Sequence, residues 1–581
     1  MIKSISQKHL AFILFLSLVV INFITSLEND RLRIIFNNYF KSAGLIFLCI
    51  ACLFFTWIAV AFCFKKEPKL SLRYSGITLF PLLLLLLWRP QDHSNLYQPI
   101  ITILLTQLCF FLILSRQDQV ATISSLKPKV LILILIVLYC AIFGYIATQK
   151  FNSFSFFNSK DFGIYNQTFY NSIEGRLFLN STYGSNFACH NSPFYFLLLP
   201  FYLMFPHPLT LIFLKIGLLA LSAIPFYLIA RLILKDSSVF PFTLTFLFYP
   251  FLISQNLTAP HEICYSPFFI LFTYYFFRQN RFLPFMIFLI LAVSIKEHFS
   301  MLALLFGIYA LFSKKRLKWV LSPALLGIFW GIFSLWIIQH FQKIYQSHTD
   351  SAWFILNLSQ RFLSQDGNFL SSLISGFSCS NISNWYSLRQ VFLLISPLGI
   401  ILPLISPVSL LGLPELTLNL LSDRPGMLSP VWHYNIIVSC FILIGTLEGV
   451  KKISHFKWVK NLNLETPTFR LLLSVFVLAC TLTHSYTWLR ITKYERDTTY
   501  INTVKQAISI VPKHAFITVP QDIAVHISNR EQYSLIESGK YGDYILVDND
   551  TWPLLQEKEI REIIENYTQI FHKNNIVVYK K

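Results

Sequence analysis

The sequence contains little charge. Only 13% of its 581 residues are Asp, Glu, Lys or Arg, while 55% are hydrophobic and the mean hydropathy is +0.56. A soluble protein of this size needs far more polar surface to enclose its core. The composition therefore excludes a soluble globular protein and predicts a polytopic α-helical membrane protein.

Acidic residues are especially scarce, since 28 Asp and Glu residues stand against 47 Lys and Arg, for a net charge of +19. The basic residues form short clusters between apolar runs rather than one stripe or motif, so we expect no nucleic-acid partner. If the N-terminus is cytoplasmic, one segment (28–41) with a modest basic excess lies outside, and the main clusters all face the cytoplasm. These clusters are residues 64–73, 115–129, 278–281, 313–318 and 451–460.

Metal-binding patterns are also scarce. Eight of the ten cysteines lie in or beside apolar runs without metal-ligand spacing, and no HExxH pattern occurs. Cys189 and Cys379 lie in polar loops, where a disulfide between them is left open. We expect no metal and no other cofactor, although a carboxylate with histidines can hold a divalent cation, so that alternative also stays open.

Long apolar runs are abundant. Hydrocarbon cannot satisfy backbone amides, so each run is expected to form a helix, and about 20 residues span the bilayer core. We expect about 13 to 15 transmembrane helices, and we interpret the first as an uncleaved anchor because it lacks a small-x-small cleavage site. The runs are 10–27, 43–64, 76–88, 101–114, 130–148, 209–234, 239–253, 263–277, 282–295, 299–312, 319–341, 391–405, 407–421, 434–447 and 471–484.

The order of these runs predicts three parts. Residues 1–129 form an N-terminal four-helix membrane extension, residues 130–489 form a membrane domain with a large outer loop at 149–193, and residues 490–581 form a small extracytoplasmic α/β domain. The last part contains no glycine-rich phosphate loop and no nucleophile elbow, which favours a docking or stabilising role over catalysis. Its predicted elements are helices at 496–510, 521–528 and 556–567 and strands at 514–520, 543–550 and 575–579.

Ionisable residues beside the apolar spans gather at the outer face in this topology. Because charged groups near bilayer depth are costly unless they are paired or functional, their convergence from distant positions predicts one outward-facing site. The residues are Asp161 and His190 at the two ends of the outer loop, His261 and Glu262 in LTAPHEICYSP, Lys296 and Glu297 in SIKEHFS, and His433.

Each of these residues also has a structural explanation. In the structural explanation, Asp161 is simply a helix N-cap, and His190 simply makes hydrogen bonds within its loop. Lys296 can extend to lipid phosphate, with Glu297 merely neutralising it. The two remaining histidines, His261 and His433, can be ordinary interfacial residues.

The segments that carry these residues resemble a known family. DFGIYNQTFYNSIEGR, CHNSPFYFLLLPFYLMFP, YPFLISQNLTAPHE, LAVSIKEHFSML and LPELTLNLLS are similar, in order and spacing, to the bacterial and archaeal membrane proteins of domain of unknown function 2079. The resemblance extends from about Asp161 to the C-terminus. That family in turn is similar to the C-type glycosyltransferase superfold, whose members use polyprenyl-phosphate-linked sugars.

The resemblance implies roles for the candidate residues. Asp161 matches the acid that acts as general base on the acceptor, and His261 with Lys296 matches the basic residues that hold the donor phosphate. His190, Glu262, Glu297 and His433 complete the expected substrate- and donor-binding set. Members of the superfold normally have one span before the acid, whereas five precede Asp161 here, so the first four spans form an extension.

The expected function is glycosyl transfer from a polyprenyl-phosphate sugar to an unknown acceptor at the extracytoplasmic face of the cytoplasmic (inner) membrane. The expected partners are the lipid-linked sugar and the membrane lipids. A lipid or solute transporter or flippase stays an alternative, although we find no clear internal repeat and the charges lie at one face rather than in mid-span. A non-catalytic membrane scaffold of the same fold also stays open.

Overall fold

The computed structural model describes residues 128–156, 158–346, 385–421, 432–460, 465–491, 496–548 and 564–581, together with residues 106, 109, 110, 427 and 429. The predicted N-terminal extension lies almost wholly outside the described residues, as do Cys379 and the predicted helix at 556–567 except for its last residues.

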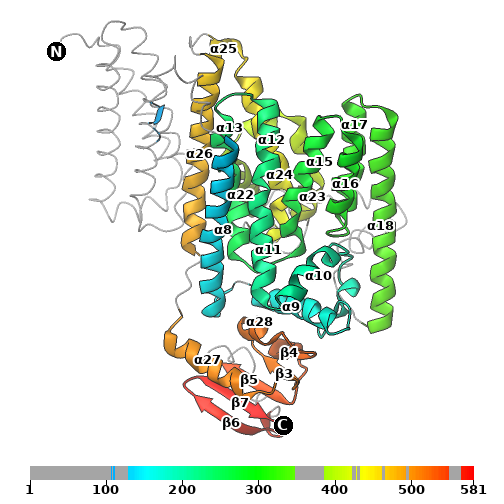
Figure 1. Cartoon of the computed structure of the whole chain (residues 1–581), viewed down its shortest axis with the longest axis vertical. Coiled ribbons are helices and arrows are strands. Elements are labelled where there is room, and N and C mark those ends of the chain that lie inside the picture. The colour runs from blue at the N-terminus through cyan, green and yellow to red at the C-terminus, as the bar shows by residue number, and fades with distance from the viewer. Residues whose placement is uncertain are drawn as a thin grey trace, which may run out of the picture.

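The membrane part is a bundle of apolar helices (Figure 1). Among the described residues, three helical stretches are long and apolar enough to cross a membrane by themselves: Val130–Asn152, Pro208–Ile233 and Leu317–Tyr345. The helices are α8 (Pro128–Asn152), α9 (Ser159–Ile173), α10 (Tyr195–Met204), α11 (Pro208–Leu221), α12 (Ala223–Ile233), α13 (Val239–Leu247), α14 (Pro250–Leu257), α15 (Ser266–Arg278), α16 (Phe282–Val293), α17 (Phe299–Phe312), α18 (Leu317–Tyr345), α22 (Trp385–Ile395), α23 (Leu413–Leu421), α24 (Ile436–Ile453), α25 (Lys457–Lys460) and α26 (Thr466–Ile491).

Several apolar runs that we expected to be single helices are broken. The run at 239–253 is divided between α13 and α14, because Pro250 starts a new helix after the extended residue Tyr249. The run at 391–405 ends as a helix at Ile395 and continues as the short 3₁₀ helices η6 (Ser396–Leu398) and η7 (Leu402–Ile405) around Gly399, whose φ is 78°. The run at 407–421 is divided between η8 (Pro407–Gly412) and α23. The total number of spans stays a prediction.

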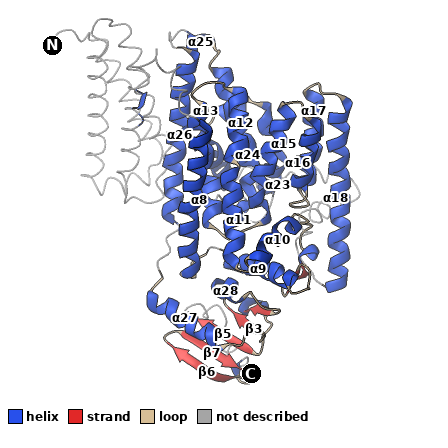
Figure 2. Cartoon of the chain, viewed as in Figure 1, coloured by secondary structure: helices blue, strands red, loops and turns tan. Residues whose placement is uncertain are grey.

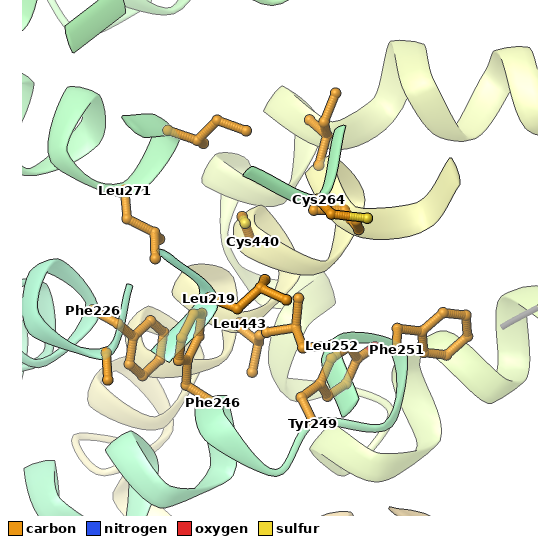
Figure 3. Close-up of a cluster of buried hydrophobic side chains, with 14 of the residues drawn as sticks. Leu219, Phe226, Phe246, Tyr249, Phe251, Leu252, Cys264, Leu271, Cys440 and Leu443 are labelled. Atoms are coloured by element: carbon orange, nitrogen blue, oxygen red, sulfur yellow. The ribbon is translucent and has the colours of Figure 1, made fainter. Parts of the chain in front are cut away.

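Aromatic and aliphatic side chains fill the interior of the bundle. Figure 3 shows part of this core, in which side chains from widely separated helices meet. The rings of Phe226 in α12 and Phe246 in α13 stack with centroids 4.8 Å apart, and both side chains are almost fully buried. Such packing holds the helices in register and so fixes the loops at their ends.

The C-terminal part contains a five-stranded mixed sheet in the order β4-β3-β5-β7-β6 (Figure 2). Strands β3 (Ile517–Val519), β4 (Tyr533–Leu535) and β5 (Tyr544–Asp548) are parallel, while β6 (Thr568–Lys573) and β7 (Ile576–Lys580) are antiparallel neighbours. The helices are α27 (Thr498–Ile510), η11 (Gln521–Ile523), α28 (Ala524–Ile527) and η12 (Ile536–Ser538). Strands β4 and β6 were not predicted, since β4 is short and β6 is largely exposed and lacks alternation.

The C-terminal part docks on α9 at one end of the bundle (Figure 1). Asn166 Nδ2 donates to Ser528 Oγ at 2.7 Å, and Gln167 Nε2 donates to the carbonyl oxygen of Glu531 at 2.9 Å. The ring of His526 lies against Phe151 and Phe154 at centroid distances of 4.2 and 3.9 Å. These contacts fix the C-terminal part against α9, and its docking or stabilising role stays a prediction.

Candidate functional site

Helix α9 carries Asp161 in its first turn, within the predicted outer loop. Asp161 is the third residue of the helix and is partly exposed, and its Oδ2 accepts a hydrogen bond from Asn158 Nδ2 at 2.5 Å. Asn158, with φ of 61°, occupies the N-cap position, so the alternative that Asp161 is the N-cap is wrong. A carboxylate in the first turn is nevertheless favourable, because it faces the positive end of the helix dipole.

Glu262 lies at the centre of a buried polar cluster. It opens η5 (Glu262–Tyr265), and its side chain is 0% exposed. Its Oε2 accepts a hydrogen bond from the Tyr165 hydroxyl at 2.6 Å and lies 2.7 Å from His261 Nδ1 and 3.7 Å from Lys296 Nζ. The His261 contact is short, but the ring is not aligned for a hydrogen bond, so its contribution is electrostatic.

These neighbours determine the charge of Glu262. Burial opposes ionisation of the carboxyl, but the adjacent imidazole of His261 and the positive charges of Lys296 and His190 outweigh burial and hold the pKa of Glu262 well below its ordinary value. Burial likewise disfavours the Lys296 ammonium, and the carboxylates of Glu262 and Glu297 reverse that effect and raise the pKa of Lys296. Both groups are therefore charged at neutral pH.

His190 and Glu297 form a second ion pair beside the first. His190 Nδ1 lies 3.0 Å from Glu297 Oε1, with 17% and 10% of the two side chains exposed. Burial raises the pKa of Glu297, but His190 and Lys296 outweigh burial and bring the pKa down to about 2. Burial also opposes the charged imidazole, yet Cys189, Glu297 and Glu262 raise the pKa of His190 to about 10.

The rings of His261 and His433 stack face to face. Their centroids are 3.3 Å apart and the planes are inclined by 16°. Burial lowers the pKa of both imidazoles, and the neighbouring His261 lowers the pKa of His433 further. Both rings are therefore neutral at pH 7, which makes such close stacking acceptable. His433 comes from η10 (His433–Asn435), so the stack joins two distant parts of the chain.

The cluster leaves several buried polar atoms without a hydrogen-bond partner. Native proteins satisfy most buried polar groups, so a group of exceptions at one place requires an explanation. Six of the fourteen such atoms found among the described residues belong to this cluster or contact it. They are Tyr195 Oη, His261 Nδ1, Glu262 Oε1, Glu297 Oε2, His298 Nε2 and His433 Nε2.

The structure thus brings together most of the residues that the sequence singled out. His190, His261, Glu262, Lys296, Glu297 and His433 form one connected set through the contacts above. Asp161 is one helical turn before Tyr165, whose hydroxyl reaches Glu262, and no direct contact joins Asp161 to the set among the described residues. The catalytic and binding roles of all seven stay predictions.

Some simpler explanations of these residues do not fit their contacts. Lys296 is 95% buried and faces Glu262, so it does not extend to lipid phosphate. Glu297 pairs with His190 rather than serving only to neutralise Lys296. His190 therefore makes a contact far beyond its own loop.

Sequence reasoning missed several members of the cluster. Tyr165 and Tyr195 contribute hydroxyls near Glu262, but tyrosines are so frequent in this chain that neither stood out. His298 Nε2 lies 3.5 Å from Glu415 Oε2, which links SIKEHFS to α23. The sequence did contain a signal for His298 and Glu415. His298 directly follows the candidate residues Lys296 and Glu297, and Glu415 is an acid within an apolar run.

No three His, Cys, Asp or Glu side chains of the described residues are grouped as metal ligands. An Asp-x-Asp pattern does occur near the C-terminus, where Asp548 Oδ2 accepts a hydrogen bond from the Tyr500 hydroxyl and Asp550 lies outside the described residues. The expectation of no cofactor, with a divalent cation left open, stays a prediction.

Comparison with protein families gives a clear match. The family described as predicted membrane protein (DUF2079) matches residues 152–578, which is most of the chain. The chain belongs to this family. The DUF2079 match begins at the end of α8 and includes all seven candidate residues, and it confirms the family prediction.

Solved structures give a weaker likeness. ArnT from Cupriavidus metallidurans bound to undecaprenyl phosphate shares 10% identity, with a TM-score of 0.44 over 77% of this DUF2079 protein and 97% of that chain. The same protein in the apo state shares 11% identity, with a TM-score of 0.45 over 78% of this chain and 98% of that chain. The oligosaccharyltransferase of Archaeoglobus fulgidus in the apo form shares 12% identity, with a TM-score of 0.38 over 71% of this chain and 70% of that chain. No curated protein matches the chain significantly. At such TM-scores the likeness carries no conclusion about activity.

Proposed function

We propose that this DUF2079 protein is a membrane glycosyltransferase that moves a sugar from a polyprenyl phosphate to an acceptor at the extracytoplasmic face. The observation that carries the proposal is the buried cluster around Glu262, which combines fixed charges with polar atoms that have no partner. Such a cluster suits a ligand that brings its own acceptors and donors. The sequence resemblance supplies the reaction class.

In the proposed reaction the acceptor oxygen attacks the anomeric carbon of the donor sugar. Asp161 takes the proton of the acceptor hydroxyl while the new carbon–oxygen bond forms. The bond between the anomeric carbon and the phosphate oxygen breaks, and its electron pair leaves with the polyprenyl phosphate. Asp161 suits this role because it is partly exposed at the edge of the cluster, whereas the two glutamates are held in ion pairs.

Negative charge grows on the phosphate as the sugar leaves, and the cluster offers groups to stabilise it. The Lys296 ammonium has three N–H donors, and Glu262 can accept from at most one of them. His190 is cationic at neutral pH and adds a second positive charge. Fixed donors and charges of this kind often make the largest contribution to catalysis. The stacked ring of His261 lies beside them and can accept a proton when a phosphate arrives.

The charge of the cluster fits this account. The carboxylates of Glu262 and Glu297 balance Lys296 and His190, while His261 and His433 are neutral. A phosphate therefore adds net negative charge to a buried region, which favours proton uptake by the nearest imidazole. Binding of the donor is thus expected to consume a proton.

Turnover by an Asp161→Asn variant tests the reaction. The full-length protein in lipid nanodiscs is incubated with polyprenyl-phosphate sugars and cell-envelope acceptors, and release of polyprenyl phosphate is measured. We expect release to fall by roughly 10²–10⁴-fold in the variant, as for loss of a general base. Retention of the donor lipid is expected to stay unchanged.

Glu174→Gln is the matched control, because Glu174 is an exposed acid at the other end of the same helix. Its turnover should equal that of the unmodified protein. If Asp161→Asn turns over normally, Asp161 is not the base. If the unmodified protein binds the donor and moves it across the bilayer without releasing polyprenyl phosphate, the protein is a transporter.

A further inference from the structure

A lysine outside the cluster is buried at the centre of an apolar helix. Lys215 lies in α11, and its side chain is 0% exposed. A cation at such a place is costly unless polar partners surround it. Its Nζ donates to the carbonyl oxygens of Gln255 at 2.5 Å and Thr258 at 2.6 Å. Both acceptors are backbone groups, so the role of this lysine is to hold a stretch of main chain.

The two carbonyls mark the end of α14. The helix ends at Leu257 with Thr258 as its C-cap. The last carbonyls of a helix have no N–H donor within the helix, so they need partners from elsewhere. A lysine ammonium satisfies these carbonyls and also interacts favourably with the negative end of the helix dipole. Lys215 thus caps α14 from a different helix, and the cap lies only three residues before His261.

The same turn of α11 also holds the chain beyond His261. The Tyr265 hydroxyl donates to the carbonyl oxygen of Leu211 at 3.1 Å, and Leu211 is one turn before Lys215. Residues 258–265, which we call the His261 turn, are therefore fixed to α11 at both ends. Gln255 adds a connection to the other histidine, because its Nε2 donates to the carbonyl oxygen of Trp432 at 3.2 Å.

We infer that Lys215 is a positioning residue whose ammonium fixes the His261 turn, and with it His261 and Glu262, in the cluster. The inference rests on the proposed function only for what the turn binds, since the contacts that fix the turn involve no ligand. A sequence search for site residues misses Lys215 because it stands alone within an apolar run.

Cys264 provides a direct measure of whether the turn is fixed. It lies within the His261 turn, is fully buried, and its Sγ donates to Gln255 Oε1 at 3.6 Å. Cys440 is equally buried in α24, so it reports on the bundle rather than on the turn (Figure 3). The rates at which N-ethylmaleimide labels the two thiols are measured by mass spectrometry on the full-length protein in nanodiscs.

Lys215→Met removes the ammonium donor from two buried carbonyls, of which Gln255 keeps only the long hydrogen bond from Thr258 Oγ1 at 3.4 Å. We expect labelling of Cys264 to become about tenfold faster while Cys440 stays protected. Tyr265→Phe, which removes the second tie with little change in volume, should give a smaller acceleration of the same kind and guards against misfolding of the first variant. Lys150→Met is the matched control, because Lys150 is a 2% exposed lysine of the neighbouring helix α8. It should leave Cys264 protected.

Three results would overturn the inference. Cys264 stays protected in both Lys215→Met and Tyr265→Phe, Cys440 becomes reactive together with Cys264, or Lys150→Met exposes Cys264 equally. Binding of undecaprenyl phosphate is measured in parallel and is expected to weaken in Lys215→Met. If Cys264 is exposed as expected but the unmodified protein does not bind the lipid, the positioning role stands and the proposed function fails.

Discussion

The two ends of helix α15 carry ion clusters of opposite character. At its far end, Glu448 accepts hydrogen bonds from Arg278 at 3.0 Å, Tyr274 at 3.2 Å and Ser406 at 2.6 Å, so both of its oxygens are satisfied. Near its first end, Glu262, which lies just before α15, and Glu297, which pairs with His190, each keep one buried oxygen without a partner. A satisfied network fastens helices together, whereas an unsatisfied one of similar composition indicates a place for a ligand.

Removing the central carboxylate of each cluster should show the difference between the two clusters most strongly. Glu262→Gln removes the carboxylate that lies nearest to the buried Lys296, and we expect a loss of about 3–5 kcal/mol of stability. Glu448→Gln should cost only about 1 kcal/mol, because 39% of the Arg278 side chain is exposed. Thermal unfolding of both variants in detergent measures the difference, and equal losses would remove the distinction between the clusters.

A ligand should stabilise one cluster and not the other. Undecaprenyl phosphate at about 100 times its dissociation constant is expected to stabilise the unmodified protein by about 2.7 kcal/mol. Glu448→Gln should show the same increase, since its cluster does not contact the ligand. The shift of the unfolding temperature on addition of the lipid measures this, and a Glu448→Gln variant that loses the shift would contradict the assignment.

The His190–Glu297 pair should make stability depend on pH. The pKa of Glu297 is lowered to about 2 from 4.5, so its contribution is complete above pH 4.5. The pKa of His190 is raised to about 10 from 6.5, so its contribution is complete below pH 6.5 and is lost as pH rises through 10.

We therefore expect the pair to contribute most, roughly 2 kcal/mol as a charge-assisted hydrogen bond, between these two limits. Unfolding temperatures of the unmodified protein and of Glu297→Gln should converge as pH is raised from 6.5 towards 10. A difference that is constant over this range would show that the pair is not ionised as described.

Binding of the phosphate should itself depend on pH. Burial lowers the pKa of His261, and a bound phosphate favours the protonated ring. Affinity for the phosphate should therefore rise as pH falls towards the pKa of His261 without phosphate. The increase is at most about tenfold per pH unit for uptake of one proton. Titrations of undecaprenyl phosphate at several pH values measure this, and His261→Ala should flatten the profile.

The sequence predicted the helices better than their breaks. The run at 299–312 coincides with α17, because an uninterrupted apolar run has only one favourable structure in a membrane. The run at 391–405 looked the same by hydropathy, yet Pro397 and Gly399 divide it, and hydropathy does not record whether backbone groups find partners elsewhere. Prolines within apolar runs were the available warning.

For the site, the sequence showed which ionisable residues are unusual, but it did not show which residues pair with each other. His190, Glu262 and Lys296 stood out because ionisable residues beside apolar spans are unusual. Their partners could not be assigned, since which of two glutamates faces which cation depends on the packing of distant helices. Tyr165 contributes through a hydroxyl at one position on α9, and no pattern in the sequence distinguishes it from other buried tyrosines.

Mass spectrometry of lipids retained by the gently purified protein tests the central claim most directly. The unmodified protein is compared with His261→Ala/Lys296→Ala and with His455→Ala/Lys457→Ala, whose exposed residues lie near α25 at the opposite end of the bundle (Figure 1). We predict that a polyprenyl phosphate or its sugar adduct is retained by the unmodified protein and the control and is lost from the first variant. Retention of only bulk phospholipid by all three would contradict the account.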